Sequence, residues 1–239
     1  MWPFPPKPLL GADMARWHLD NFAWLIRSHG QRSRFAEARL VLPSPDFFAT
    51  EGQQGHALAL ALFGNIKAYC GMGDADIALV QADGPPARID SPQVASPRVI
   101  YAAALLANPQ SFIAAMAHEL ARHLLAERSA EPPPLGTQGE EHLTDLAAVY
   151  LGFGVFLANS AFTMRTHADG WSYSRQGYLP EQDLVFALAI FMKVKRLAPG
   201  PALHFLKADL GAMLRRALRE LQSYKSEIAA MRQEQSASR

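Results

Sequence analysis

The residues with the clearest chemical potential lie in the stretch Ala117-His118-Glu119-Leu120-Ala121-Arg122-His123. Two histidines four residues apart share one face of an α-helix and can bind the same zinc ion. A glutamate directly after the first histidine can then activate a zinc-bound water. His118 and Glu119 fit this pattern as a metal ligand and a catalytic base. The pattern breaks at position 122, which is an arginine, and His123 comes one residue too late.

The position of His123 leaves two alternatives open. Five residues of a regular α-helix turn through about 500°, so the side chains of His118 and His123 diverge by about 140°. Both can reach one metal ion only if the helix contains a π-bulge, a feature that does occur at functional sites. Without a bulge, His123 is expected on the helix surface or beside the core.

A second group of candidate residues lies downstream, where Glu141 and Asp145 stand four residues apart. They follow Arg122 by 19 and 23 residues. With this spacing the chain resembles the gluzincin metallopeptidases such as thermolysin, in which a second helix supplies a glutamate ligand. Four residues later in those proteins, an aspartate orients a zinc-binding histidine. The resemblance implies that Glu141 occupies a metal-ligand position and that Asp145 supports His118.

A wider resemblance is to uncharacterised bacterial zincin-like proteins. These combine a HELAH-like helix, an E-x-x-T-D-L segment with a glycine pair, and a later Gly-Tyr-Leu. The matching segments here are residues 118–125, 141–154 and 177–179. The resemblance implies an α+β fold, namely a mostly helical zincin-like domain with a small sheet and a two-helix active-site core.

Arg122 decides which function the sequence favours. A guanidinium stays protonated and has no free lone pair, so it cannot bind zinc. It can form a bidentate pair with a carboxylate such as Glu141, which would put one fixed cation in place of the metal. The favoured prediction is therefore a degenerate zincin-like protein, a non-catalytic binding or regulatory module for an unknown protein or peptide. It is expected to carry no metal as purified.

The alternative is an active zinc-dependent metallopeptidase, a hydrolase. In it, His118, Glu141 and a bulged His123 would bind zinc, and Glu119 would be the general base. A plain helical interaction domain is a third possibility, but it leaves the spacing from His118 to Asp145 unexplained.

Three further side chains could border a cleft near these residues. His142 adjoins Glu141, His167 follows the second motif helix, and Tyr178 lies in an aromatic stretch. Each has a simpler explanation, because histidines on helix surfaces are often exposed and aromatic side chains often hold a loop against the protein body.

Composition excludes several classes of function. The net charge is +1, and the 23 Lys and Arg residues are spread along the chain, which argues against a nucleic-acid partner. No stretch approaches the roughly 20 uncharged apolar residues of a membrane span. The longest apolar stretch, residues 146–162, is interrupted by two glycines and is better explained as a buried core helix. The N-terminus lacks the apolar run of a signal peptide, and Cys70 is the single cysteine. A cytoplasmic protein is expected.

The pattern along the chain predicts one domain over residues 13–232, preceded by a Pro-rich segment (1–12) and followed by a flexible tail (233–239). Asn108 and Pro109 have the residue types of a helix cap and a first helical position. Helices are expected over residues 13–26, 56–68, 109–127, 140–162, 180–199 and 203–231. Strands are expected over residues 35–42, 76–80 and 98–104, and a loop over 170–177.

Overall fold

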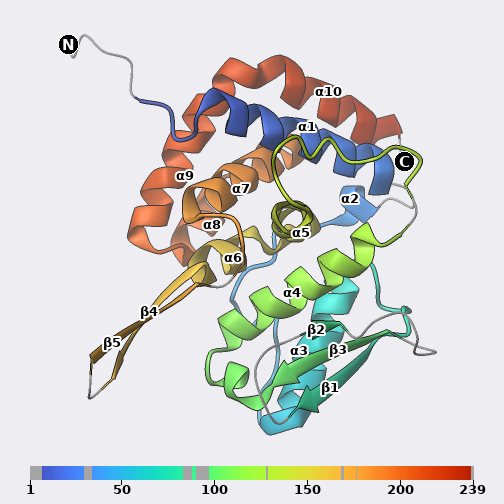
Figure 1. Cartoon of the computed structure of the whole chain (residues 1–239), viewed down its shortest axis with the longest axis vertical. Helices are drawn as coiled ribbons and strands as arrows, with labels where there is room; N and C mark the ends of the chain where they lie inside the picture. The colour runs from blue at the N-terminus through green and yellow to red at the C-terminus, as the bar shows by residue number, and fades with distance from the viewer. Residues whose placement is uncertain are drawn as a thin grey trace.

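The protein has the mostly helical α+β fold that the sequence predicts (Figure 1). The computed structural model describes residues 7–29, 34–82, 88–89, 97–127, 129–167, 170–175 and 177–237, with only the backbone described at 88–89, 162–167 and 170–175. The helices are α1 (Ala12–His29), α2 (Arg34–Glu37), α3 (Gly55–Tyr69), α4 (Pro109–Leu125), α5 (Glu140–Ala148), α6 (Gly154–Ser160), α7 (Glu181–Lys195), α8 (Gly200–Phe205), α9 (Ala208–Glu220) and α10 (Lys225–Ala237). The strands are β1 (Ala78–Ala82), β2 (Arg88–Ile89), β3 (Arg98–Ala102), β4 (Phe162–His167) and β5 (Gly170–Arg175).

A small mixed sheet precedes the first motif helix. Its strand order is β1-β3-β2, with β1 parallel and β2 antiparallel to β3. The predicted strands at 76–80 and 98–104 correspond to β1 and β3. On β3, Val99 and Tyr101 are buried, and the chain then passes through a 3-10 turn, η2 (Ala103–Ala107), directly into α4.

Helix α4 joins the two parts of the fold. It packs against α3 on one side and against α5 and α6 on the other, so it lies between the sheet region and the remaining helices (Figure 1). The helix begins as predicted. The Asn108 side chain accepts a hydrogen bond from the backbone N–H of Ser111 at 3.2 Å, and Pro109 occupies the first turn.

The second motif helix is kinked. Helix α5 continues into a π-helical turn, η3 (Val149–Phe153), and then into α6. Gly152 has φ 102°, and a Cβ there would lie 2.0 Å from the carbonyl oxygen of Arg39. Both glycines of the apolar stretch are closely packed, because a Cβ at Gly154 would lie 3.1 Å from the Leu188 side chain. The prediction that the helix passes through Gly152 without a break is wrong.

The same helix is the one segment among the described residues that is long and apolar enough to cross a membrane. It runs over Glu140–Ser160, and 94% of its most apolar window is buried inside the protein. Such burial is expected for a core helix, which is the interpretation given above for the apolar stretch at residues 146–162.

Three other predictions about elements need correction. Residues 35–42 do not form a strand. Arg34–Glu37 form the short helix α2, and the chain then crosses η3, where the Val41 N–H donates to the Gly152 carbonyl. Residues 170–175 are a strand, β5, paired antiparallel with β4. The single helix predicted over 203–231 is divided among α8, α9 and α10. Helix α10 also extends to Ala237, so residues 233–237, which the sequence pattern assigns to the tail, are helical.

Candidate functional site at the junction of two helices

Asp145 is the buried centre of the candidate site. Its side chain is 2% exposed. One carboxylate oxygen, Oδ1, lies 2.8 Å from Nδ1 of His118, and Oδ2 accepts hydrogen bonds from the backbone N–H groups of Tyr178 and Leu179 at 2.6 and 2.7 Å. These contacts join α4, α5 and the segment before α7. A carboxylate can be buried here because charge-assisted hydrogen bonds replace its water shell.

The contact with Asp145 determines how the His118 ring is oriented. Because the carboxylate can only accept, Nδ1 carries a proton and Nε2 presents its lone pair away from Asp145. The nearest group to Nε2 is a guanidinium nitrogen of Arg122, Nη2, at 3.2 Å. On one side of the ring, Tyr178 is stacked with ring centroids 6.1 Å apart. His118 is thus held in one tautomer, with Nε2 available to a cation.

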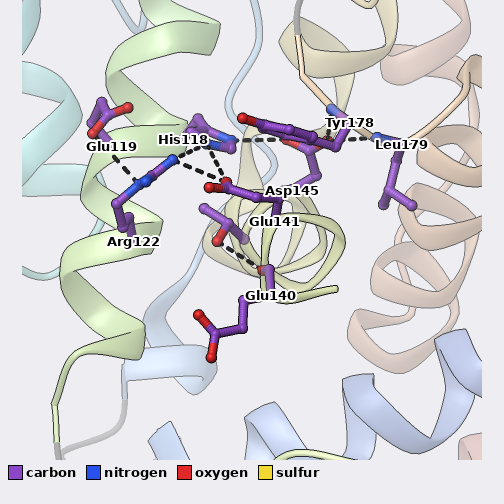
Figure 2. Close-up of polar contacts among 9 residues, drawn as sticks. His118, Glu119, Arg122, Glu140, Glu141, Asp145, Tyr178 and Leu179 are labelled. Atoms are coloured by element: carbon purple, nitrogen blue, oxygen red, sulfur yellow. Dashed lines mark hydrogen bonds and ion pairs between the residues drawn. The ribbon is translucent and has the colours of Figure 1, made fainter. Parts of the chain in front are cut away.

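Arg122 places its guanidinium between His118 and Glu141, as Figure 2 shows. Its Nη2 donates to Oε2 of Glu141 at 2.9 Å, and that oxygen lies 3.7 Å from Nε2 of His118. His118, Arg122, Glu141 and Asp145 thus lie together, and Arg122 pairs with Glu141 as expected, but through a single Nη2–Oε2 hydrogen bond and not in the expected bidentate geometry. The two paired side chains are 42% and 37% exposed, so their ion pair contributes at most about 1 kcal/mol to stability.

Glu119 approaches the same guanidinium from another direction. Its side chain is 7% exposed, and Oε2 lies 3.8 Å from Nε of Arg122. Three carboxylates (Glu119, Glu141 and Asp145) therefore surround one imidazole and one fixed cation (Figure 2). This excess of negative charge favours a cation at the position that the guanidinium occupies.

The outcomes for the other four sequence candidates differ. Helix α4 is regular over Pro109–Leu125, so His123 points about 140° away from His118, and the bulge that the enzymatic alternative needs does not occur there. His142 helps to lower the pKa of His18 on α1 and therefore lies near that helix. His167 ends β4, and its side chain lies outside the described part. Tyr178 does border the site and is 47% exposed.

The site contains backbone donors that sequence analysis missed. Gly177 has φ 84°, and a Cβ at this position would lie 3.0 Å from Oδ2 of Asp145. A glycine here lets the chain pass close to the carboxylate, so that the next two N–H groups can bind it. The Gly-Tyr-Leu sequence drew attention to these residues, but nothing in the pattern identified their backbone as the binding group.

The side chains present do not form a zinc site of the usual kind. Structural and catalytic zinc sites take at least three protein ligands. His118 Nε2 and Glu141 Oε2 are suitable, but Asp145 is occupied by three donors and His123 is turned away. Within the described ranges, no three His, Cys, Asp or Glu side chains are arranged to hold one metal ion.

No protein-family model, curated protein or solved structure matches this chain. The geometry of these residues is therefore the basis for the function proposed below.

Proposed function

We propose that this chain is a zincin-like domain in which the Arg122 guanidinium takes the place of the metal, and that it acts as a non-catalytic binding or regulatory module. The supporting observation is the position of Nη2, 3.2 Å from Nε2 of His118 and 2.9 Å from Oε2 of Glu141. In a gluzincin these two atoms would be zinc ligands. A tethered cation shared by both keeps the two helices joined without a metal.

The shortage of metal ligands supports the same proposal. Two protein ligands bind zinc too weakly for it to survive purification. The guanidinium also competes for both ligands, since it repels a divalent cation and donates to each of their lone pairs. Hydrolysis would require a metal-bound water, so Glu119 has no catalytic task in this proposal.

A binding role is supported by the accessibility of the site. Tyr178 is 47% exposed beside a His118 ring that is itself mostly buried. An exposed aromatic ring next to half-exposed charged groups is a common composition for surfaces that bind proteins and peptides. We propose a protein or peptide partner in the cytoplasm, where the buried thiol of Cys70 would remain reduced.

The decisive experiment restores the missing ligand. Arg122→His would place a second imidazole one turn after His118 and remove the competing cation. Zinc content of the purified proteins and zinc titration by calorimetry would be compared for the unmutated chain, Arg122→His and Arg122→Ala. We expect well under one zinc per chain in the unmutated protein. Arg122→His should bind zinc at least about tenfold more tightly than Arg122→Ala, because three ligands replace two.

Two controls separate metal binding from other effects. His118→Ala in the Arg122→His background should abolish the gain, whereas Glu119→Gln should leave it intact because Glu119 is not a ligand in this scheme. Stoichiometric zinc in the unmutated protein, lost on His123→Ala, would contradict the proposal and favour the metallopeptidase. Equal zinc affinities of Arg122→His and Arg122→Ala would show that the helices do not retain zincin geometry.

A further inference from the structure

A second histidine–aspartate pair is buried on the other side of α5. His18 of α1 and Asp183 of α7 lie 165 residues apart in sequence, and Nε2 of His18 is 3.0 Å from Oδ1 of Asp183. Their side chains are 0% and 4% exposed. Since the carboxylate accepts, Nε2 carries the proton of the neutral ring, and this hydrogen bond ties α1 to α7 inside the core.

No described residue hydrogen-bonds the remaining nitrogen of His18. Nδ1 is buried without a hydrogen bond, and the same is true of Nδ1 of His142 and Oδ1 of Asn21. In the neutral ring Nδ1 is an acceptor, and leaving it unpaired costs little compared with burying an unpaired charged donor. Protonation would create that donor, an N–H at Nδ1 facing no acceptor. The neutral ring therefore fits this environment and the imidazolium does not.

Side chains of α1, α5 and α7 surround His18. Asp183 faces it from α7 and His142 from α5, and these are its titratable neighbours. The rings of Trp17 and Phe186 cover it, at centroid distances of 5.0 and 5.8 Å. The acidic residues of α10 that contact α1 lie elsewhere, because Glu227 pairs with Arg16 and Glu234 with Arg27.

We propose that the His18–Asp183 pair is an acid-sensitive lock that holds α1 on the protein at neutral pH and releases it when His18 is protonated. Release would let water reach Nδ1, which is excluded from water while α1 is packed. It would also free the segment before α5, because Trp17 Nε1 and Asn21 Nδ2 donate to the carbonyl oxygens of Leu135 and Pro134. The apolar face of α1, including Phe22 and Leu25, would become exposed.

The direction of the pH effect follows from burial. Desolvation lowers the pKa of His18 below its ordinary value of 6.5, although the hydrogen bond and negative charge of Asp183 act in the opposite sense. The unfolded or released state then binds the proton more readily than the packed state. Stability is therefore complete above pH 6.5 and falls as the pH drops from 6.5 towards the lowered pKa of the packed state.

Hydrogen exchange of the full chain at pH 7.5 and 5.5, corrected for intrinsic rates, tests the lock. We expect protection of the α1 amides to fall at pH 5.5 by up to about tenfold, the limit set by one pH unit below 6.5, while α4 amides change less. His18→Gln can still donate to Asp183 but cannot be protonated, so its α1 protection should not respond to pH. His204→Gln, which replaces an exposed histidine on α8, is the control and should behave like the unmutated protein.

Equal pH responses of α1 in the unmutated protein and in His18→Gln would overturn the proposal. If His18→Gln does not fold, the ring resonances of His18 in the unmutated protein decide the question. A titration below pH 6.5 that coincides with the loss of α1 protection supports the lock. A titration at or above pH 6.5, or no loss of protection, rejects it.

Discussion

At the scale of single residues, Asp145 contributes more to the structure than Arg122, which it supports indirectly through His118. The Arg122–Glu141 pair is half exposed, whereas Asp145 is 2% exposed and accepts hydrogen bonds from two backbone N–H groups and one imidazole. Burial removes the option of water as a replacement partner. The aspartate therefore determines where His118 and the segment at Tyr178 lie.

We predict that Asp145→Asn lowers the free energy of unfolding by about 1.5–3 kcal/mol. The amide keeps one acceptor oxygen but turns an N–H₂ group towards either His118 or the two backbone donors. Urea denaturation followed by circular dichroism would measure this loss. The matched control is Asp20→Asn, since Asp20 is 49% exposed and makes only a 3.8 Å pair with Arg16. The control should lose less than about 0.5 kcal/mol, and equal losses in the two variants would contradict the assignment.

At the scale of elements, the kink in the second motif helix depends on one glycine. Gly152 combines φ 102° with a close approach to the Arg39 carbonyl, and its own carbonyl accepts from Val41 N–H. The kink allows residues 39–41 to cross the helix, with the Val41 N–H bonded to the Gly152 carbonyl. It also separates α5, which bears the site residues, from α6.

Gly152→Ala should destabilise the protein by at least about 2 kcal/mol, since a side chain at this φ is strained and its Cβ overlaps Arg39. Gly64→Ala is the matched control, because Gly64 lies within α3 with no atom within 4 Å of an added Cβ. That change should raise stability by about 0.5–1 kcal/mol. Thermal unfolding of the two variants measures both effects. A Gly152→Ala protein as stable as the unmutated chain would show that the kink is not required.

At the scale of the whole molecule, α4 connects the sheet and α3 to the helices around α7. The site lies on the face of α4 towards α5. A movement of α4 and the sheet region relative to α5 and α7 would therefore alter the distance from Arg122 to Glu141. Cys70, just after α3, offers a way to detect such opening. It is fully buried, and burial raises the pKa of its thiol, which disfavours the reactive thiolate.

We predict that Cys70 does not react with a thiol reagent such as DTNB in the native protein at pH 7.5. Because it is the single cysteine of the chain, labelling reports one position. The reaction rate should rise with urea in parallel with the loss of helical signal, as expected when the two parts unfold together. Rapid labelling well before the helical transition would show instead that the α3 region opens independently.

The sequence determined the features that depend on neighbours a few residues away. The four-residue spacings of His118 to Arg122 and of Glu141 to Asp145 place each pair on one helix face, and the structure has them there. The cap at Asn108 and the first-turn Pro109 were likewise visible, because capping is a local interaction. The pairing of Arg122 with Glu141 followed from the charge and donor geometry of the two side chains.

The tertiary structure decided everything that depends on distant parts of the chain. Residues 35–42 have the composition of a strand, but none of the described strands pairs with them, and Val41 bonds instead to Gly152. The proximity of His142 to His18 depends on how α5 meets α1, which helical periodicity does not specify. The partners of Asp145 at Tyr178 and Leu179, and the His18–Asp183 pair, join segments 33 to 165 residues apart. Such contacts form only when the packed core brings those segments together, so no local pattern reveals them.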